Sequence, residues 1–122
     1  MTGDDRAYDL AERTAAFGEQ CVALGRRLKL DAVTDPLIRQ MVRATTSVGA
    51  NYCEADEAGS KKEFRYRISL CARESRESKH WLRMLSKAVT EKQKEELRSL
   101  WKEADELSRI FATIHRNSAD KT

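Results

Sequence analysis

A chain of 122 residues, 40% of them apolar and 35% charged, is long enough for one hydrophobic core and too short for two. One proline and five glycines supply few of the turns that a many-stranded fold needs. No run of about 18 apolar residues occurs, and the first residues lack the apolar segment of a signal peptide, so we expect a soluble, cytoplasmic, helical protein with no membrane partner.

The first half of the chain predicts two helices joined by a turn. Small and apolar residues at three- and four-residue spacing predict a first helix over residues 6–28, with this stripe: Leu10, Thr14, Phe17, Cys21, Leu24 and Leu28. Asp35 is predicted to cap a second helix over residues 36–57, because its short side chain can accept from an unpaired amide of the first turn. Pro36 suits the first helical position, since its missing amide hydrogen would find no partner there.

A capping box predicts the start of the third helix. Gly59 ends the second helix, and Ser60 with Glu63 pairs otherwise orphaned amides at the start of a helix over residues 60–89. Its main stripe is Phe64, Ile68, Cys71, Ser75, Ser78, Leu82, Leu85 and Val89. The two serines make this stripe narrow, so we expect a neighbouring helix to approach closely there.

A fourth helix completes the predicted architecture. Thr90 and Gln93 are a second capping-box candidate, opening a helix over residues 90–117. Its stripe is Leu97, Leu100, Ala104, Leu107, Phe111 and Ile114. Helices with short links pack antiparallel to their neighbours. The sequence therefore predicts an all-α fold, an antiparallel up-down four-helix bundle in which residues 1–122 form a single domain.

A second stripe on the third helix mixes carboxylates with apolar residues. Glu74 and Glu77 lie between Leu70 on one side and Trp81 and Met84 on the other. An apolar patch left uncovered by a bundle often marks an interface. We therefore expect this stripe to take part in contacts between subunits.

The second helix carries polar residues that are expected to face this stripe. Ser47, Asn51 and Glu54 follow one another at four- and three-residue spacing, and Asn51 and Glu54 are predicted to approach Arg73, Glu74 and Glu77. Buried charge is costly unless it is paired. A hydrogen-bonded network that fixes helix register or a subunit contact is the favoured interpretation, and a site for a ligand, metal or partner is the other. The candidate residues are Ser47, Asn51, Glu54, Glu74, Glu77 and Trp81.

Positive charge is concentrated in one segment. Residues 60–87 hold nine basic residues against three acids, whereas the remainder of the chain is net −3. A basic helix can follow phosphates and release their counterions, which makes these residues nucleic-acid-binding candidates: Lys61, Lys62, Arg65, Arg67, Arg73, Arg76, Lys79, Arg83 and Lys87. An ordinary solvated helix face with local ion pairs is the alternative.

Patterns for metal binding and catalysis are incomplete. Glu77 and His80 form a Glu-x-x-His pair like those of di-iron bundles, but such a site needs a second pair, and His115 follows Ala112 instead. No glycine-flanked nucleophilic serine or phosphate-binding glycine loop occurs. The cysteines fall on apolar stripes, where we expect buried reduced thiols: Cys21, Cys53 and Cys71. We therefore expect no catalytic residue, no metal, no cofactor and no enzyme activity.

Two runs of sequence resemble a known family. The run SVGANYCEADEAGSKKEF, followed by RESRESKHWLRML, resembles the ribosomal-RNA intervening-sequence proteins, also called simply four-helix-bundle proteins. The positions that match the family pattern are Ser47, Asn51, Glu54, Ala55, Ser60, Glu63, Phe64, Glu74, Glu77, Trp81 and Leu82. Arg73 stands where the family usually has Lys, Ser75 for Ala, Ser78 for Thr and His80 for Tyr.

The resemblance implies an assembly and a class of partner. Members form antiparallel four-helix bundles that assemble as homopentameric rings, and a related branch of retroelement accessory proteins contacts reverse transcriptase and nucleic acid. No catalytic activity comes with the resemblance. We expect a homo-oligomeric scaffold, pentameric by resemblance, with RNA, DNA or a ribonucleoprotein as partner. The alternative is a protein–protein interaction module that binds no nucleic acid.

Overall fold

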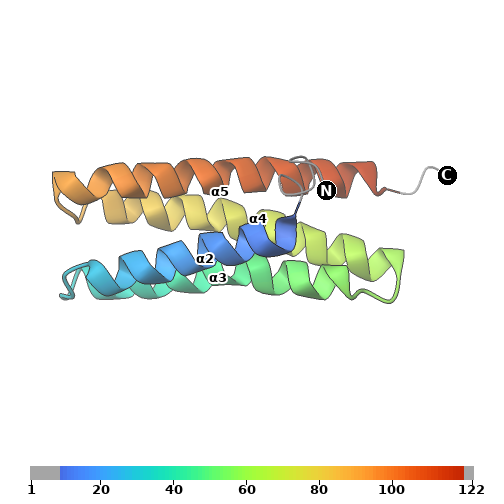
Figure 1. Cartoon of the computed structure of the whole chain (residues 1–122), viewed down its shortest axis with the longest axis horizontal. Coiled ribbons are helices and arrows are strands. Elements are labelled where there is room, and N and C mark those ends of the chain that lie inside the picture. Colours follow the sequence, from blue (N-terminus) through green and yellow to red (C-terminus); the bar gives the residue numbers. More distant parts are fainter. Residues whose placement is uncertain (1–8, 120–122) are drawn as a thin grey trace.

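The computed structural model describes residues 9–119, which form a four-helix bundle. The helices are α2 (Leu10–Arg27), α3 (Thr34–Asp56), α4 (Lys61–Ser86) and α5 (Glu91–Asn117). Helices consecutive in the chain run antiparallel, with α2 beside α3 and α4 beside α5 (Figure 1). This confirms the predicted all-α fold. Within the described residues, none of the helices has the length and apolar composition needed to cross a membrane.

The predicted apolar stripes form the core. Every member of the α2 stripe is buried, and so are the stripes of α4 from Ile68 to Leu85 and of α5 from Leu97 to Phe111. The rings of Tyr52 and Phe111 meet with their centroids 5.9 Å apart, which joins α3 to α5. Burial of these side chains is the main stabilising contribution to the bundle.

The narrow part of the α4 stripe is fully buried, as predicted. Ser75 and Ser78 each have 0% of their surface exposed. Their hydroxyls donate to carbonyl oxygens of the preceding turn, Ser75 to Cys71 at 2.8 Å and Ser78 to Glu74 at 2.7 Å. Since the hydroxyls are satisfied within α4, the serines can face apolar neighbours without an unpaired polar atom.

The start of α3 corrects the predicted cap. The helix begins at Thr34, and Asp35 lies inside its first turn instead of capping it. Asp31 supplies the acceptor, because its Oδ1 receives the amides of Val33 and Thr34, each at 2.9 Å. Pro36 is still tolerated, since amides of the first turn have no intrahelical partner.

The start of α4 confirms the Ser60 cap with one difference. The Glu63 amide donates to Ser60 Oγ at 3.1 Å, whereas Glu63 Oε2 accepts from the amide of Gly59, also at 3.1 Å. At its other end α4 stops at Ser86, three residues short of the predicted end. The amides of Lys87 and Ala88 donate to the carbonyls three residues earlier, a 3₁₀-type pattern that ends the α-helix.

The beginning of α5 follows the prediction. Thr90 is the residue before the helix, and its amide donates to Gln93 Oε1 at 3.4 Å. At the other end of the chain, α2 begins at Leu10 with Asp9 as its cap. Residues 6–8 of the predicted first helix lie outside the described residues.

The cysteines differ from one another in exposure. Cys21 and Cys71 are buried, and burial raises the pKa of each thiol to about 12. Cys53 is exposed, so its predicted burial is wrong. It lines a groove between α2 and α3.

Candidate functional site

A polar cluster joins α3 to α4, and its central residue was not among the candidates. Arg43 of α3 pairs with Glu74 at 3.3 Å and with Glu77, and the Trp81 indole donates to Glu77 Oε1 at 3.1 Å. We call Arg43, Glu74, Glu77 and Trp81 the Arg43 cluster. The Trp81 hydrogen bond and the Arg43 charge hold the pKa of the Glu77 carboxyl below its usual value.

The other candidates of this group lie further along the helices. Asn51 donates to the Ser47 carbonyl at 3.0 Å and accepts from Arg67 Nη1 at 3.5 Å, while Glu54 and Arg73 are exposed. Because α3 and α4 are antiparallel, residues later in α3 face residues earlier in α4. The predicted approach of Asn51 and Glu54 to Glu74 and Glu77 is therefore wrong.

Arg43 could have been found from the same spacing that singled out its neighbours. It precedes Ser47 by four residues on the edge of α3 that continues to Asn51, and the Ser47 hydroxyl donates to the Arg43 carbonyl at 2.6 Å. The cluster's one cation pairs with two carboxylates across the contact between α3 and α4. This arrangement supports the structural interpretation, in which the cluster fixes the register of α3 on α4.

The basic residues of α4 share a face. At 3.6 residues per turn, all the predicted basic candidates except Arg67 fall within about 120° of the helix circumference, on the side of α4 that borders α5 and solvent. Arg67 instead lies on the α3 side, and its buried Nε has no partner within the described residues.

Some of these cations hold the bundle together. Lys79 pairs with Asp105 of α5 at 3.0 Å, and Arg65 donates to the His115 carbonyl at 3.2 Å and to Ser118 Oγ at 3.3 Å. Five further exposed cations among the candidates make no ion pair within residues 9–119, and we call them the cationic face of α4: Lys62, Arg73, Arg76, Arg83 and Lys87. These five are available to an anionic partner.

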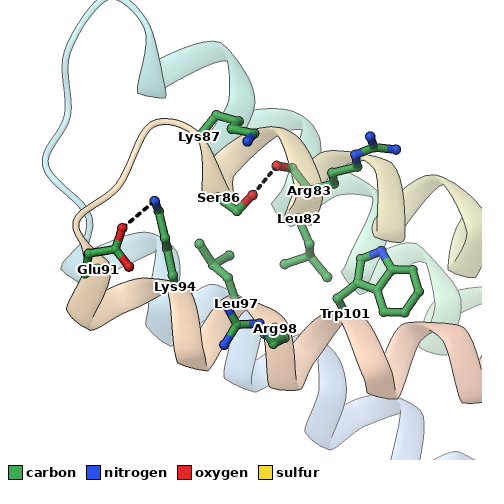
Figure 2. Close-up of a pocket in the computed structure, with 9 residues that line it drawn as sticks. All are labelled: Leu82, Arg83, Ser86, Lys87, Glu91, Lys94, Leu97, Arg98 and Trp101. Carbon is green, nitrogen blue, oxygen red and sulfur yellow. Dashed lines mark hydrogen bonds and ion pairs between the residues drawn. The ribbon is translucent and has the colours of Figure 1, made fainter.

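A groove continues this face onto α5, near the link between the two helices (Figure 2). We call it the α4–α5 groove; its volume is about 560 Å³. The buried side chains of Leu82 and Leu97 contribute to its apolar lining. Trp101 lines it at one end with 37% of its surface exposed, and Lys79 Nζ lies 5.4 Å from the centre of the indole ring.

The charges that line the α4–α5 groove are mostly positive. Four cations from the two helices line it: Arg83, Lys87, Lys94 and Arg98. Glu91 is the one carboxylate among the lining residues, and it pairs with Lys94 at 2.8 Å, which lowers the pKa of the Glu91 carboxyl. The surplus of three positive charges equals the formal net charge of the whole chain, +3.

Sequence reasoning found only the α4 half of this groove. Lys94, Arg98 and Trp101 were missed because the charge surplus was sought within one segment and not across two helices. Their four- and three-residue spacing places them on one edge of α5, beside the buried Leu97 stripe. That spacing was the available signal.

The other edge of α5 has the opposite character. Arg13 of α2 pairs with Glu103 at 2.8 Å and with Glu106 at 2.9 Å, and Arg27 pairs with Glu96. These carboxylates are paired with cations of α2. On the edge next to α4, Lys94 pairs with Glu91, and Arg98 makes no ion pair within residues 9–119.

The described residues do not assemble a metal site. Among residues 9–119, no group of three or more His, Cys, Asp or Glu side chains is placed to hold a metal ion. In the Glu77–His80 pair, Glu77 is engaged by Arg43 and Trp81, and the His80 ring packs edge-on against Trp81 with centroids 4.8 Å apart.

Comparison with known proteins places the chain in a family. No curated protein matches it. A crystal structure of a protein of unknown function from the S23 ribosomal protein family of Bacteroides thetaiotaomicron has a similar fold, with a TM-score of 0.72, 24% sequence identity, and coverage of 86% of this chain and 96% of that one. The family model described as 23S rRNA-intervening sequence protein matches residues 6–113. The chain therefore belongs to the 23S rRNA-intervening sequence protein family.

Proposed function

We propose that this chain is a non-enzymatic helical scaffold that associates with nucleic acid through the cationic face of α4. The observation that carries the proposal is the row of exposed cations on one side of α4 that make no ion pair within residues 9–119. The name of the family, which refers to intervening sequences of 23S rRNA, is consistent with an RNA or ribonucleoprotein partner.

The proposal depends on which cations already make contacts within the bundle and which do not. Lys79 and Arg65 contact α5 and stabilise the bundle, whereas Arg73, Arg76 and Arg83 project into solvent. A cation that contacts a phosphate releases condensed counterions, so binding of this kind weakens steeply as salt rises and depends little on sequence.

The test replaces Arg73, Arg76 and Arg83 together by Gln. Affinity should fall for structured RNA and for single- and double-stranded DNA alike, and the slope of log K against log salt should flatten by roughly two to three, at about 0.7 to 0.9 per lost phosphate contact. Replacing Lys61, Lys62 and Arg65 is less suitable, because Arg65 holds the end of α5.

A matched control removes the same charge elsewhere. Arg26, Lys29 and Arg39 are exposed cations of the α2–α3 side, and their replacement by Gln lowers the net charge equally. This control should keep most of the affinity and the native salt slope. Equal losses in both triple variants would contradict a defined binding face, and a native protein that binds none of these ligands at low salt would contradict the proposal.

Assembly into a homo-oligomer is the second proposal, and a protein-interaction module without nucleic-acid binding is the alternative function. A groove of about 540 Å³ runs between α2 and α3, and small or apolar residues such as Ala15, Gly18, Val22 and Ala50 line it. A lining of this kind favours close approach of a helix from a second copy of the chain.

Light scattering coupled to size exclusion tests this assembly. The resemblance to the family leads us to expect a pentamer, and Ala15→Glu should shift it toward monomer because a carboxylate would be buried without a partner. Glu12→Gln is a control outside the groove. A native monomer at micromolar concentration would contradict this proposal and leave nucleic-acid binding to be judged separately.

A further inference from the structure

We infer that the α4–α5 groove is a binding site for an unpaired nucleotide of a single strand, with the base against Trp101 and the phosphates on the surrounding cations. The inference rests on the proposed function. It goes further by assigning contact with a base to the groove, which shares Arg83 and Lys87 with the cationic face.

The lining of the groove fits a base. Trp101 is the largest apolar side chain there and is 37% exposed, so part of its ring is open to a ligand. Leu82 and Leu97, both buried, add apolar surface next to it. A flat aromatic ligand gains contact with all three, and stacking on an indole tolerates any base because every base has a π-face.

Trp101 is also held in position. Lys79 lies 5.4 Å from its ring centre and is itself anchored to Asp105 at 3.0 Å. A fixed ring loses less conformational freedom when a base stacks on it, so more of the stacking energy is available for binding. The cation over the ring adds positive charge beside the stacked base.

The charges around the groove fit phosphates. Arg83 and Lys87 come from α4 and Arg98 from α5, so cations border the apolar lining from both helices (Figure 2). None of the three makes an ion pair within residues 9–119, in contrast to Lys94, which pairs with Glu91. A chain of nucleotides crossing the groove would meet these cations on both sides of the stacked base.

The volume of the groove suits a small part of a strand. About 560 Å³ lies within the range of sites for small ligands and excludes a whole duplex. In a duplex the bases are stacked on one another and cannot reach Trp101, whereas an unpaired base can. The groove should therefore favour single strands, while the cationic face of α4 should not distinguish them from duplexes.

The experiment compares two ligands and two substitutions at one position. The ligands are an oligouridine strand of about ten nucleotides and an RNA duplex of about the same number of phosphates. Trp101→Leu should weaken binding of the strand about tenfold and binding of the duplex less than about twofold, because only the strand offers a base to stack. Trp101→Phe, which keeps an aromatic ring, should remain within about threefold of native affinity for the strand.

Fluorescence gives an independent readout. The chain has two tryptophans, so in a Trp81→Phe background Trp101 is the sole indole and should be quenched by the strand. Circular dichroism of every variant checks that the bundle is intact.

The outcomes separate this inference from the proposed function. A strand affinity unchanged by Trp101→Leu, or equal losses for strand and duplex in a folded variant, would overturn the groove inference and leave nucleic-acid association standing. A native protein that binds neither ligand at low salt would overturn both.

Discussion

The two sides of α4 use charge in opposite ways. On the α3 side, Arg43 pairs with Glu74 and Glu77, and the indole of Trp81 donates to Glu77. On the α5 side, the α4–α5 groove collects cations around an exposed Trp101 with a single carboxylate among its lining residues. Trp81 of α4 thus lies in a hydrogen-bonded network, whereas Trp101 of α5 lies beside cations that make no ion pair within residues 9–119. The first arrangement is suited to structure and the second to binding.

The largest expected effect distinguishes the two tryptophans. Trp81 is half-buried and packs against the core, so Trp81→Ala should lower the free energy of unfolding by about 3 kcal/mol through lost burial and the lost bond to Glu77. Trp101→Ala should cost less, about 2 kcal/mol, because 37% of its surface is already in water. Urea unfolding measures both. If both substitutions lowered the free energy of unfolding equally, the two indoles would contribute equally to stability, and the contrast between the two sides of α4 would fail. If Trp81 also lies at a subunit contact, light scattering of Trp81→Ala will show a smaller particle.

A second prediction concerns the core between these two sides. Ser78 is fully buried, so Ser78→Leu should overpack the bundle and destabilise it by about 2 kcal/mol. Ser99→Leu adds the same volume at an exposed position of α5 and should change stability by less than about 0.5 kcal/mol. A more stable Ser78→Leu variant would show that α4 has room on this face.

A third prediction tests whether the Arg43 cluster is structural. Arg43→Ala leaves Glu74 and Glu77 without their cation and should cost about 1 kcal/mol, a modest value because the side chains are partly exposed. The depressed pKa of Glu77 means that its stabilisation is present above pH 4.5 and is lost as pH falls through the lower native value. The difference between native and variant stability should therefore shrink below pH 4.5. Arg39→Ala, at an exposed pair with Asp35, is the matched control and should show little effect.

The smallest effect on stability is expected in the groove. Arg98→Gln should change the free energy of unfolding by less than about 0.5 kcal/mol, because Arg98 makes no ion pair within the described residues. A loss of stability comparable to that of Arg43→Ala would show that Arg98 has a structural partner. Thermal unfolding of the two variants side by side provides the comparison.

The fold was predictable because its signals are local. The stripes of α2, α4 and α5 follow from three- and four-residue spacing, and the Ser60 cap lies within four residues of chain. The start of α3 was missed because Asp31 and Asp35 are both plausible caps, and only the path of the preceding turn decides between them.

The sites were less predictable because they depend on how helices pair. Arg43 meets Glu77, and Trp101 lies beside the basic residues of α4, only through the register of antiparallel neighbours. Spacing along one helix places a residue on a face but does not say which residue of the next helix lies opposite. Glu54 illustrates this limit, since its spacing matched the candidate group and its side chain is exposed.

Because the three cysteines differ in burial, their rates of reaction report on two different properties of the molecule. Cys53 lies among the residues lining the α2–α3 groove and is open to a thiol reagent, whereas Cys21 and Cys71 become reactive only when the helices part. The first thiol to be modified therefore measures access to the α2–α3 surface, and a docked second copy would slow it. Modification of Cys21 and Cys71 measures how often the bundle opens, and it requires no substitution in the chain.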